Sequence, residues 1–297
     1  MSLKRLSSAI LASVVVIGTA GMARAAAPET VPVADSGNKA DTTGYGDVAY
    51  EYKIGKYEVT NTEYCEFLNA VAKSDSHGLY DPRMGGRDDR TGEAYGGITR
   101  SGWYGKYVYK VRPGAANWPV GYVTWESAAR YANWLTNGAA EGSDTEKGCY
   151  TFKWGEVKVA DHATLAAAEK TTWAIASENE WYKAAYYDAK KSGGAGYWKY
   201  PAKSDWPTDA NINSNQVRDA GSFPKAASAY GTFDQGGNLW EYNDNRSGGK
   251  VGLRGGSFYI NDNENYMRST TRYDVLSAKW PNYGFRVVAL GGSEEAK

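Results

Sequence analysis

Apolar residues recur at helical spacing in three segments of the chain, and each segment opens with a residue that can cap a helix. Thr60-x-x-Glu63 is a capping-box pattern, followed by Tyr64, Phe67, Leu68 and Val71. Thr124 precedes the second segment, whose apolar positions are Ala128, Tyr131, Ala132 and Leu135. Ser177-x-x-Glu180 is a second capping box and opens the third, with Trp181, Ala184 and Ala185. These segments predict three helices whose apolar faces belong to the core.

Strand patterns are short and scattered between these helices. Residues 48–57 alternate aromatic or β-branched positions with polar ones, which predicts a strand. We expect an edge strand at residues 30–33, a hairpin near 104–111, short strands within 150–159, and strands at 253–258 and 284–290. Helices and strands do not alternate regularly, so a parallel sheet is not indicated. The pattern predicts an α+β fold with low regular secondary structure.

The N-terminus has the pattern of an export signal. Lys4 and Arg5 precede a mostly apolar run, and Ala23-Arg-Ala25 fits a cleavage site, which predicts a signal peptide at residues 1–25. The alternative is a membrane anchor, although the run is short for a span. We expect an extended lead-in at 26–45, one domain at 46–292 and a tail at 293–297. No later segment reaches about 18 apolar residues, so the mature chain should lack a transmembrane segment and be secreted or periplasmic, in the cell envelope.

Composition narrows the classes of function. The chain has 34 basic and 34 acidic residues, and loss of residues 1–25 would leave it slightly acidic. Such a balance gives no electrostatic reason to expect nucleic acid or a membrane surface as a partner. The 24 Tyr and 11 Trp residues suit either the packing of a loop-rich fold or a recognition surface. No pattern for nucleophilic hydrolysis or nucleotide binding is present.

Cysteine and histidine are scarce. Cys65 and Cys149 could form a disulfide in an exported protein, or they could be separate buried thiols. With no C-x-x-C spacing and two isolated histidines, His77 and His162, a zinc or thiol-redox site is not expected.

Six blocks in order give the chain a family resemblance. They are Ile54–Asn61, Pro119–Trp125, Ala176–Trp181, Asp234–Tyr242, Leu253–Phe258 and Tyr283–Val288. In this order they resemble the formylglycine-generating enzyme, or sulfatase-modifying factor, family over about residues 47–290. The resemblance implies a variant of the C-type-lectin-like fold, with helices packed on small antiparallel sheets.

One block predicts a structural calcium site. Asp234 and Glu241 flank a glycine-containing turn that can direct carbonyl oxygens toward one point, as hard cations require. The resemblance implies ligands from the side chains of Asp234 and Glu241 and the carbonyls of Gly237 and Leu239. The alternative is a capped turn with Glu241 in a salt bridge. The resemblance also implies a second calcium site at Asn211 and Ile212, for which Asp219 is the nearest downstream acidic candidate.

The catalytic block of the family is where this chain differs. In the family enzymes a cysteine three residues after the Ser of "G-G-S", and another five further on, bind copper(I) and activate oxygen to make formylglycine. From Ser257 those positions hold Ile260 and Asn265. Soft thiolates suit copper(I), and these side chains do not replace them. We therefore expect no copper and no catalytic residues of this type.

The same segment predicts a binding surface. Tyr and Asn together provide rigid aromatic area and adaptable hydrogen bonding, and the resemblance extends to ligand-binding proteins that vary this region. The candidate contact residues are Ser257, Tyr259, Asn261, Asn263, Asn265, Tyr266, Tyr273 and Trp280. We expect an exported protein that binds an extracellular peptide, glycan or protein through residues 257–284. The alternatives are a peptide-modifying oxidoreductase with altered active-site chemistry and a structural envelope protein without a small ligand.

Overall fold

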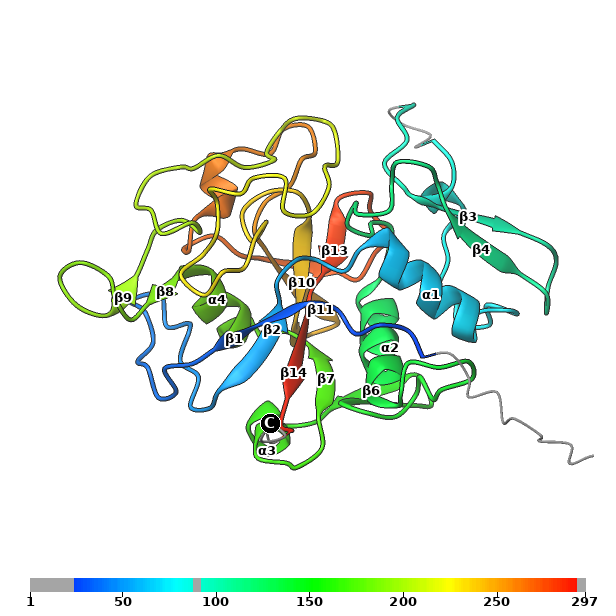
Figure 1. Cartoon of the computed structure of the whole chain (residues 1–297), viewed down its shortest axis with the longest axis horizontal. Coiled ribbons are helices and arrows are strands. Elements are labelled where there is room, and N and C mark those ends of the chain that lie inside the picture. The colour runs from blue at the N-terminus through cyan, green and yellow to red at the C-terminus, as the bar shows by residue number, and fades with distance from the viewer. Residues whose placement is uncertain (1–23, 88–91, 293–297) are drawn as a thin grey trace, which may run out of the picture.

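The computed structural model describes residues 24–87 and 92–292 (Figure 1). The predicted signal segment at 1–25, except its last two residues, and the predicted tail at 293–297 lie outside this part of the chain. The helices are α1 (Asn61–Val71), α2 (Trp125–Thr136), α3 (His162–Ala166) and α4 (Glu178–Tyr186), with 3₁₀ turns η1 (Pro82–Met84) and η2 (Glu264–Met267). None of the helices within the described ranges is long and apolar enough to cross a bilayer.

The strands are short and form small sheets. They are β1 (Thr30–Val33), β2 (Tyr52–Gly55), β3 (Ile98–Ser101), β4 (Val108–Val111), β5 (Tyr150–Lys153), β6 (Glu156–Val159), β7 (Thr172–Ile175), β8 (Tyr187–Asp188), β9 (Gly196–Tyr197), β10 (Trp240–Ser247), β11 (Lys250–Arg254), β12 (Tyr273–Leu276), β13 (Tyr283–Phe285) and β14 (Val287–Leu290). Two four-stranded sheets have the orders β1-β2-β14-β7 and β12-β11-β10-β13, and the pairs β3-β4, β5-β6 and β8-β9 complete the described set. The expected α+β architecture with low regular secondary structure is confirmed.

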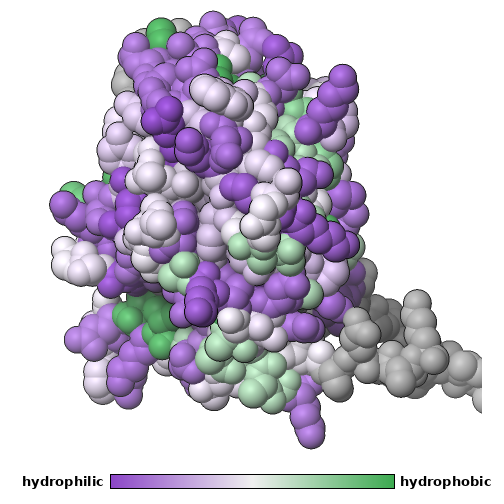
Figure 2. Space-filling model, turned by 90° about the vertical axis from the view of Figure 1, so that its left-hand side faces the viewer, coloured by the Kyte–Doolittle hydropathy of each residue, from purple (hydrophilic) through white to green (hydrophobic). Residues whose placement is uncertain are grey.

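The two larger sheets lie at the centre of the molecule, with α4 on one side and α1 and α2 on the other (Figure 1). Strand β14 pairs with both β2 and β7, so the C-terminal strand joins the N-terminal and middle parts of the chain. All the strand pairs in these sheets are antiparallel except β10 with β13, a parallel pair that the sequence pattern did not indicate. The face on the α4 side is covered mainly by hydrophilic residues (Figure 2).

The three predicted helix starts are confirmed. Thr60 accepts a hydrogen bond from the Glu63 amide, and the Glu63 carboxylate accepts one from the Thr60 amide. Thr124 caps α2, and Ser177 forms the reciprocal capping box with Glu180 at the start of α4. Each cap satisfies amides that have no partner within the helix and typically contributes about 1 kcal/mol.

An aromatic cluster joins α1 and α2 to the central strands. The Tyr131 ring lies 5.5 Å from the rings of both Phe67 and Phe285, and the Phe67 ring lies 5.4 Å from that of Trp134. All four side chains are buried. The cluster accounts for part of the abundant Tyr and Trp through packing, since buried aromatic rings remove large apolar areas from water.

Several strand boundaries differ from the sequence pattern. The predicted strand at 48–57 is confined to β2, and the one predicted at 253–258 is β11, which ends at Arg254. β11 ends there because Gly255 and Gly256 have φ angles of 107° and 75°, which turn the chain away from the sheet. The hairpin predicted near 104–111 begins earlier, with β3, and the strand predicted at 284–290 is divided into β13 and β14. Strands β7, β8, β9, β10 and β12 and helix α3 were not predicted.

Candidate functional site

The predicted contact surface rests on the turn that follows β11. A Cβ atom at Gly256 would lie 3.1 Å from Ile212 Cδ1 and 3.1 Å from Tyr266 Cβ. The positive φ angle of Gly256 also disfavours any other residue. Glycine therefore allows the turn to pack closely against two neighbouring segments, one containing Ile212 and the other Tyr266.

Ser257 is fully buried and organises the base of the surface. Its hydroxyl donates to Asp262 Oδ2 at 2.6 Å and accepts from Asn282 Nδ2 at 3.0 Å. Trp240 Nε1 donates to the same Asp262 oxygen at 2.8 Å. Burial raises the pKa of Asp262, and the hydrogen bonds from Ser257 and Trp240 oppose that rise. Ser257 thus supports the surface from below, rather than lining it.

Three aromatic rings form a platform above this base. The Trp240 ring lies 5.5 Å from the Tyr266 ring and 5.3 Å from the Tyr273 ring, and the two tyrosine rings are 5.8 Å apart. Tyr273 is 43% exposed, whereas Trp240 is buried. Trp280 is 39% exposed and its ring lies 6.4 Å from that of Tyr283, which places it beside β13.

The predicted asparagines lie on the loop that follows the base and includes η2. Asn263 caps η2 by accepting a hydrogen bond from the Asn265 amide at 3.0 Å. The Asn261 amide donates to Asn213 Oδ1 at 3.1 Å, which ties the loop to the 211–215 segment. Asn261 and Asn265 are exposed, and the half-buried Tyr259 packs its ring 5.9 Å from that of Tyr95. The loop is therefore fixed through its main chain and presents amide groups to solvent.

The two positions that would carry cysteines in the formylglycine-generating family lie on the same exposed loop. Ile260 is 51% exposed and Asn265 is exposed. Both cysteines of the chain are buried free thiols, Cys65 within α1 and Cys149 directly before β5. The structure therefore contains separate buried thiols, not the Cys65–Cys149 disulfide that was the other alternative.

The predicted calcium loop contains a buried ion pair. Glu241 is buried and accepts two hydrogen bonds from Arg286, Nε to Oε2 and Nη2 to Oε1, each at 2.6 Å. Trp181 Nε1 donates to Glu241 Oε2 at 2.8 Å. The salt bridge considered as the alternative role of Glu241 is thus present.

The loop and the neighbouring Glu58 nevertheless hold more buried carboxyl groups than Arg286 can pair with. Asp234 is buried and accepts the Gly221 amide at 2.6 Å, and burial raises its pKa to about 6. Burial, and then the charges of Asp234 and Glu241, raise the pKa of Glu58 well above its ordinary value. Three buried carboxyl groups thus lie near one guanidinium, and a bound cation would favour their ionised forms, so this set of oxygens suits an additional cation.

Side chains alone do not complete a metal site here. In the described ranges, no group of three or more His, Cys, Asp or Glu side chains is arranged to hold a metal ion. A calcium ion would therefore also need main-chain oxygens, and Gly237, with a φ of 87°, and Leu239 lie between the two acidic residues. The residues present fit such a mixed set of oxygen ligands, with Glu241 shared between the ion and Arg286.

The second predicted cation position is engaged in hydrogen bonds. Asn211 Oδ1 accepts from Ser214 Oγ at 2.6 Å, and Asn211 Nδ2 donates to Asn238 Oδ1 at 2.9 Å. The Asn211 carbonyl accepts the Asn238 amide at 2.8 Å, while Ile212 contacts the Gly256 turn. Asp219 is exposed. Asn211 therefore joins its own loop to the 234–241 loop.

The sequence matches the model of the sulfatase-modifying factor enzyme 1-like domain over residues 21–290, nearly the whole chain. The chain belongs to this family. No curated protein sequence matches the chain significantly.

One solved structure supports this fold. The crystal structure of CarF is similar with a TM-score of 0.52 and 17% identity, covering 88% of this chain and 98% of that one. Treponema denticola variable protein 1 (TM-score 0.47, 18% identity, coverage 87% and 94%) and PvdO from Pseudomonas aeruginosa (0.45, 17%, 88% and 90%) are also similar. At such identities the comparison concerns the fold.

The arginines of this sulfatase-modifying factor domain have structural contacts. Arg254 is buried, forms a salt bridge with Glu178 and donates to the carbonyls of Ser269 and Thr271. Arg272 also pairs with Glu178, at 2.8 Å. These contacts tie the loop after η2 to α4 and so fix one end of the contact surface.

Several organising residues escaped the sequence reading. Asp262, Trp240 and Asn282 form the base with Ser257; Asp262 and Asn282 lie within the predicted 257–284 segment but were not named as site residues, and Trp240 was named only in the calcium block. His162 had been given no role. It is buried with Nδ1 3.0 Å from Glu180 Oε2 and Nε2 3.2 Å from Asp244 Oδ2. The Glu180 capping box was the available signal, but nothing in the sequence placed His162 beside it.

Proposed function

We propose that this protein is an exported binding module that recognises an extracellular peptide, glycan or protein through its 257–284 surface, without generating formylglycine. The observation that carries the proposal is the pairing of exposed Tyr and Asn side chains with a buried, hydrogen-bonded base. Asp262 accepts from both Ser257 and Trp240, so the loop above it is held in place before any ligand binds. Such preorganisation lowers the entropic cost of binding.

The side chains at positions 260 and 265, Ile260 and Asn265, support the proposal that the protein does not generate formylglycine. Copper(I) chemistry in this family needs two neighbouring thiolates, and the side chains at these two positions contain no sulfur. Both are exposed and take part in a polar and aromatic surface instead. The proposed role of this surface is therefore recognition.

A structural calcium ion at the 234–241 loop is part of the proposal. The excess of buried carboxylates over Arg286 supports it, with Asp234, Glu241 and the carbonyls of Gly237 and Leu239 as the ligands. When bound, the ion would balance the buried charge. Asp234 and Glu241 would hold this loop beneath the turn at Gly255, whose carbonyl accepts the Gly237 amide.

The binding proposal is tested by screening the purified protein on peptide and glycan arrays and then measuring the affinity of each hit. Asn265→Ala and Tyr273→Ala should each weaken binding about tenfold or more, as expected for contact residues at the centre of an interface. Trp206→Ala is the matched control, because Trp206 is 79% exposed on a different loop. Equal affinities for all three variants would reject the 257–284 surface as the binding site.

A second candidate follows from family membership. A peptide-modifying oxidoreductase with altered chemistry would consume oxygen when supplied with a cysteine-containing peptide and copper(I). Oxygen uptake above that of a heat-inactivated sample would favour this candidate over a binding module. Oxygen uptake equal to that of the heat-inactivated sample would exclude this oxidoreductase candidate.

A further inference from the structure

The β3–β4 hairpin projects from the side of the molecule beyond α1 (Figure 1). Its inner face is firmly attached to that helix. Asn69 accepts the Tyr109 amide at 2.9 Å and donates to the Tyr109 carbonyl at 3.0 Å, and the Tyr109 hydroxyl donates to the Ala72 carbonyl at 2.8 Å. The Tyr107 amide also donates to the Lys73 carbonyl at 3.1 Å. The hairpin is thus a fixed projection.

The tip of this hairpin exposes two large aromatic side chains. Trp103 is 67% and Tyr104 is 70% exposed, and all residues from 101 to 106 are exposed. Gly102 and Gly105 have φ angles of 86° and 84°, and the Lys106 amide donates to the Trp103 carbonyl at 2.8 Å. The turn therefore has a defined backbone that directs an apolar pair away from the core.

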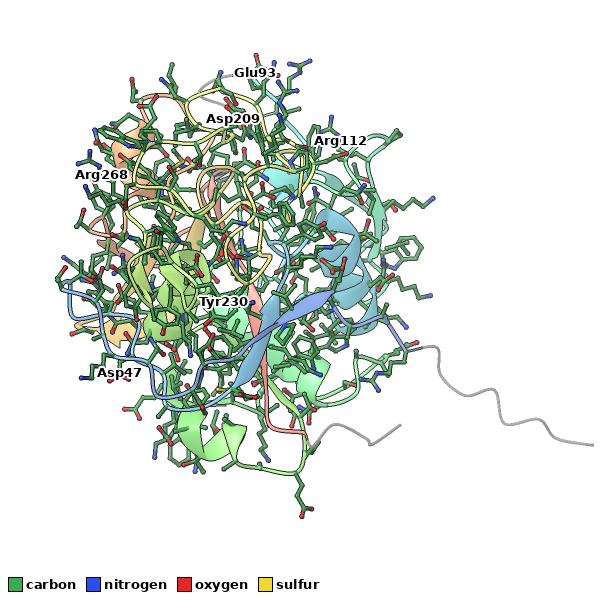
Figure 3. All side chains as sticks on the ribbon, turned by 60° about the vertical axis from the view of Figure 1, so that its left-hand side comes forward. Asp47, Glu93, Arg112, Asp209, Tyr230 and Arg268 are labelled. Carbon is green, nitrogen blue, oxygen red and sulfur yellow. The ribbon has the colours of Figure 1, made fainter. Side chains whose placement is uncertain are left out.

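The charge of the hairpin is strongly one-sided, although the chain as a whole is balanced. Residues 98–112 contain Arg100, Lys106, Lys110 and Arg112 and no acidic residue. Arg100 pairs with Asp75 at 3.3 Å, whereas Lys106 and Lys110 form no salt bridge with any residue that the structure describes. Arg112, labelled in Figure 3, donates to the Gly96 carbonyl at the base. The outer part of the hairpin therefore carries uncompensated positive charge beside its aromatic tip.

We propose that this hairpin docks the protein on the surface of an anionic lipid bilayer. Trp103 and Tyr104 enter the headgroup layer, where aromatic rings with a polar edge are favourable. Lys106 and Lys110 approach the anionic headgroups, which attract basic side chains within about a Debye length. A convex tip of two rings does not enclose a soluble ligand, but it can insert into a soft, flat surface. The balanced net charge does not oppose this, because the attraction is local.

Vesicle flotation of the mature protein tests the proposal. The protein should float with vesicles of phosphatidylcholine mixed with phosphatidylglycerol and remain unbound to pure phosphatidylcholine. Trp103→Ser with Tyr104→Ser should weaken the apparent affinity about tenfold or more, because both anchoring rings are lost. Lys106→Gln with Lys110→Gln should weaken it by about 25-fold, at about fivefold for each basic residue, and added salt should mimic this loss. Trp206→Ser is the control and should bind as the unaltered chain does.

Three results would overturn the proposal. One is the absence of flotation with anionic vesicles. Another is equal binding of the Trp103/Tyr104 variant and the Trp206 control. The third is that binding, both to dextran sulfate and to vesicles, requires Lys106 and Lys110 but not Trp103 and Tyr104. That result would indicate a soluble polyanion as the partner. Unchanged melting temperatures of the hairpin variants show that they remain folded, since the substituted side chains are exposed.

Discussion

Removal of the Glu241 charge is expected to destabilise the protein strongly. The guanidinium of Arg286 is fully buried and is neutralised by Glu241 through two hydrogen bonds of 2.6 Å. Its remaining donors bond to main-chain carbonyls, at 3.0 Å to Gly55 and 2.8 Å to Phe233. Glu241→Gln keeps the size of the side chain but removes the only carboxylate that bonds directly to the buried Arg286 among the described residues, a loss that typically costs about 3–5 kcal/mol.

The effect should be measurable by equilibrium urea denaturation and by thermal melting. For a domain of this size, 1 kcal/mol corresponds to about 2–4 °C, so the melting temperature should fall by roughly 6–20 °C. Glu29→Gln is the matched control because it removes a partly exposed pair with Lys56, 2.9 Å long, whose contribution is about 0–1 kcal/mol. Combining Glu241→Gln with Arg286→Met should recover part of the loss, since the buried guanidinium that lost its bonded carboxylate is then also removed.

The reasoning would be refuted by a loss below about 1 kcal/mol for Glu241→Gln, or by a loss no larger than that of the Glu29 control. A double variant less stable than Glu241→Gln alone would show that the carbonyl contacts of Arg286, not its charge pairing, dominate its contribution.

Three further predictions concern charge, calcium and the turn. Burial alone would lower the pKa of His162, but Glu180 and Asp244 raise it to about 12. Its ion pairs therefore stabilise the fold fully below about pH 6.5 and progressively less as pH rises toward 12. The difference in free energy of unfolding between the unaltered chain and His162→Gln should then shrink above pH 6.5. A difference that widens would contradict the stabilising role of these ion pairs. Burial raises the pKa of Asp234 from 3.8 to about 6, so without calcium stability should fall by about 3 kcal/mol as pH rises across that interval, and calcium should restore it near pH 7. Asp234→Ala should abolish this response in melting experiments, and a chelator without effect on the unaltered chain would count against a calcium site. Gly256→Ala should lower the free energy of unfolding by about 1–3 kcal/mol more than Gly44→Ala does, because both glycines have positive φ angles but only Gly256 has neighbours within 4 Å of an added Cβ atom. Equal losses of stability in urea denaturation would show that crowding at the turn is unimportant.

The sequence predicted best those features that depend on local chemistry. The caps at Thr60, Thr124 and Ser177 could be located because a capping residue and its helix lie within a few positions of each other. The edge strand β1 was also found from its local pattern. The family and the fold followed from the order of six short blocks, which the family comparison confirms.

Features that depend on distant contacts were missed. Strand β10 reads as a polar segment, Trp-Glu-Tyr-Asn-Asp-Asn-Arg-Ser, and its buried Glu241 is accommodated by polar partners far along the chain, Trp181 and Arg286. Likewise, Ser257 was expected on the surface but is buried because Asn282 and Asp262 bond to its hydroxyl. A polar side chain in the core is stable only with partners, and the sequence does not show which distant residue supplies them.

The arrangement of the candidate contact residues was foreseen in part, while their role in binding stays a prediction. Tyr266 and Tyr273 come together as expected, but their shared support, Trp240, was assigned only to the calcium block. Trp280 lies beside Tyr283 rather than on the Trp240 platform. The composition of the loop therefore indicated the kind of surface, while its arrangement depended on packing between segments about 30 residues apart in the chain.

The most direct test of the account is mass spectrometry of a cysteine-containing peptide incubated with the protein, copper(I) and oxygen. We predict that the cysteine is not converted to the formylglycine aldehyde, because Ile260 and Asn265 offer no thiolate to copper(I). The variant with both positions changed to Cys is the matched comparison, and retention of copper(I) by that variant alone would confirm that the missing sulfurs decide the outcome. Formation of the formylglycine aldehyde by the unaltered chain would contradict the account.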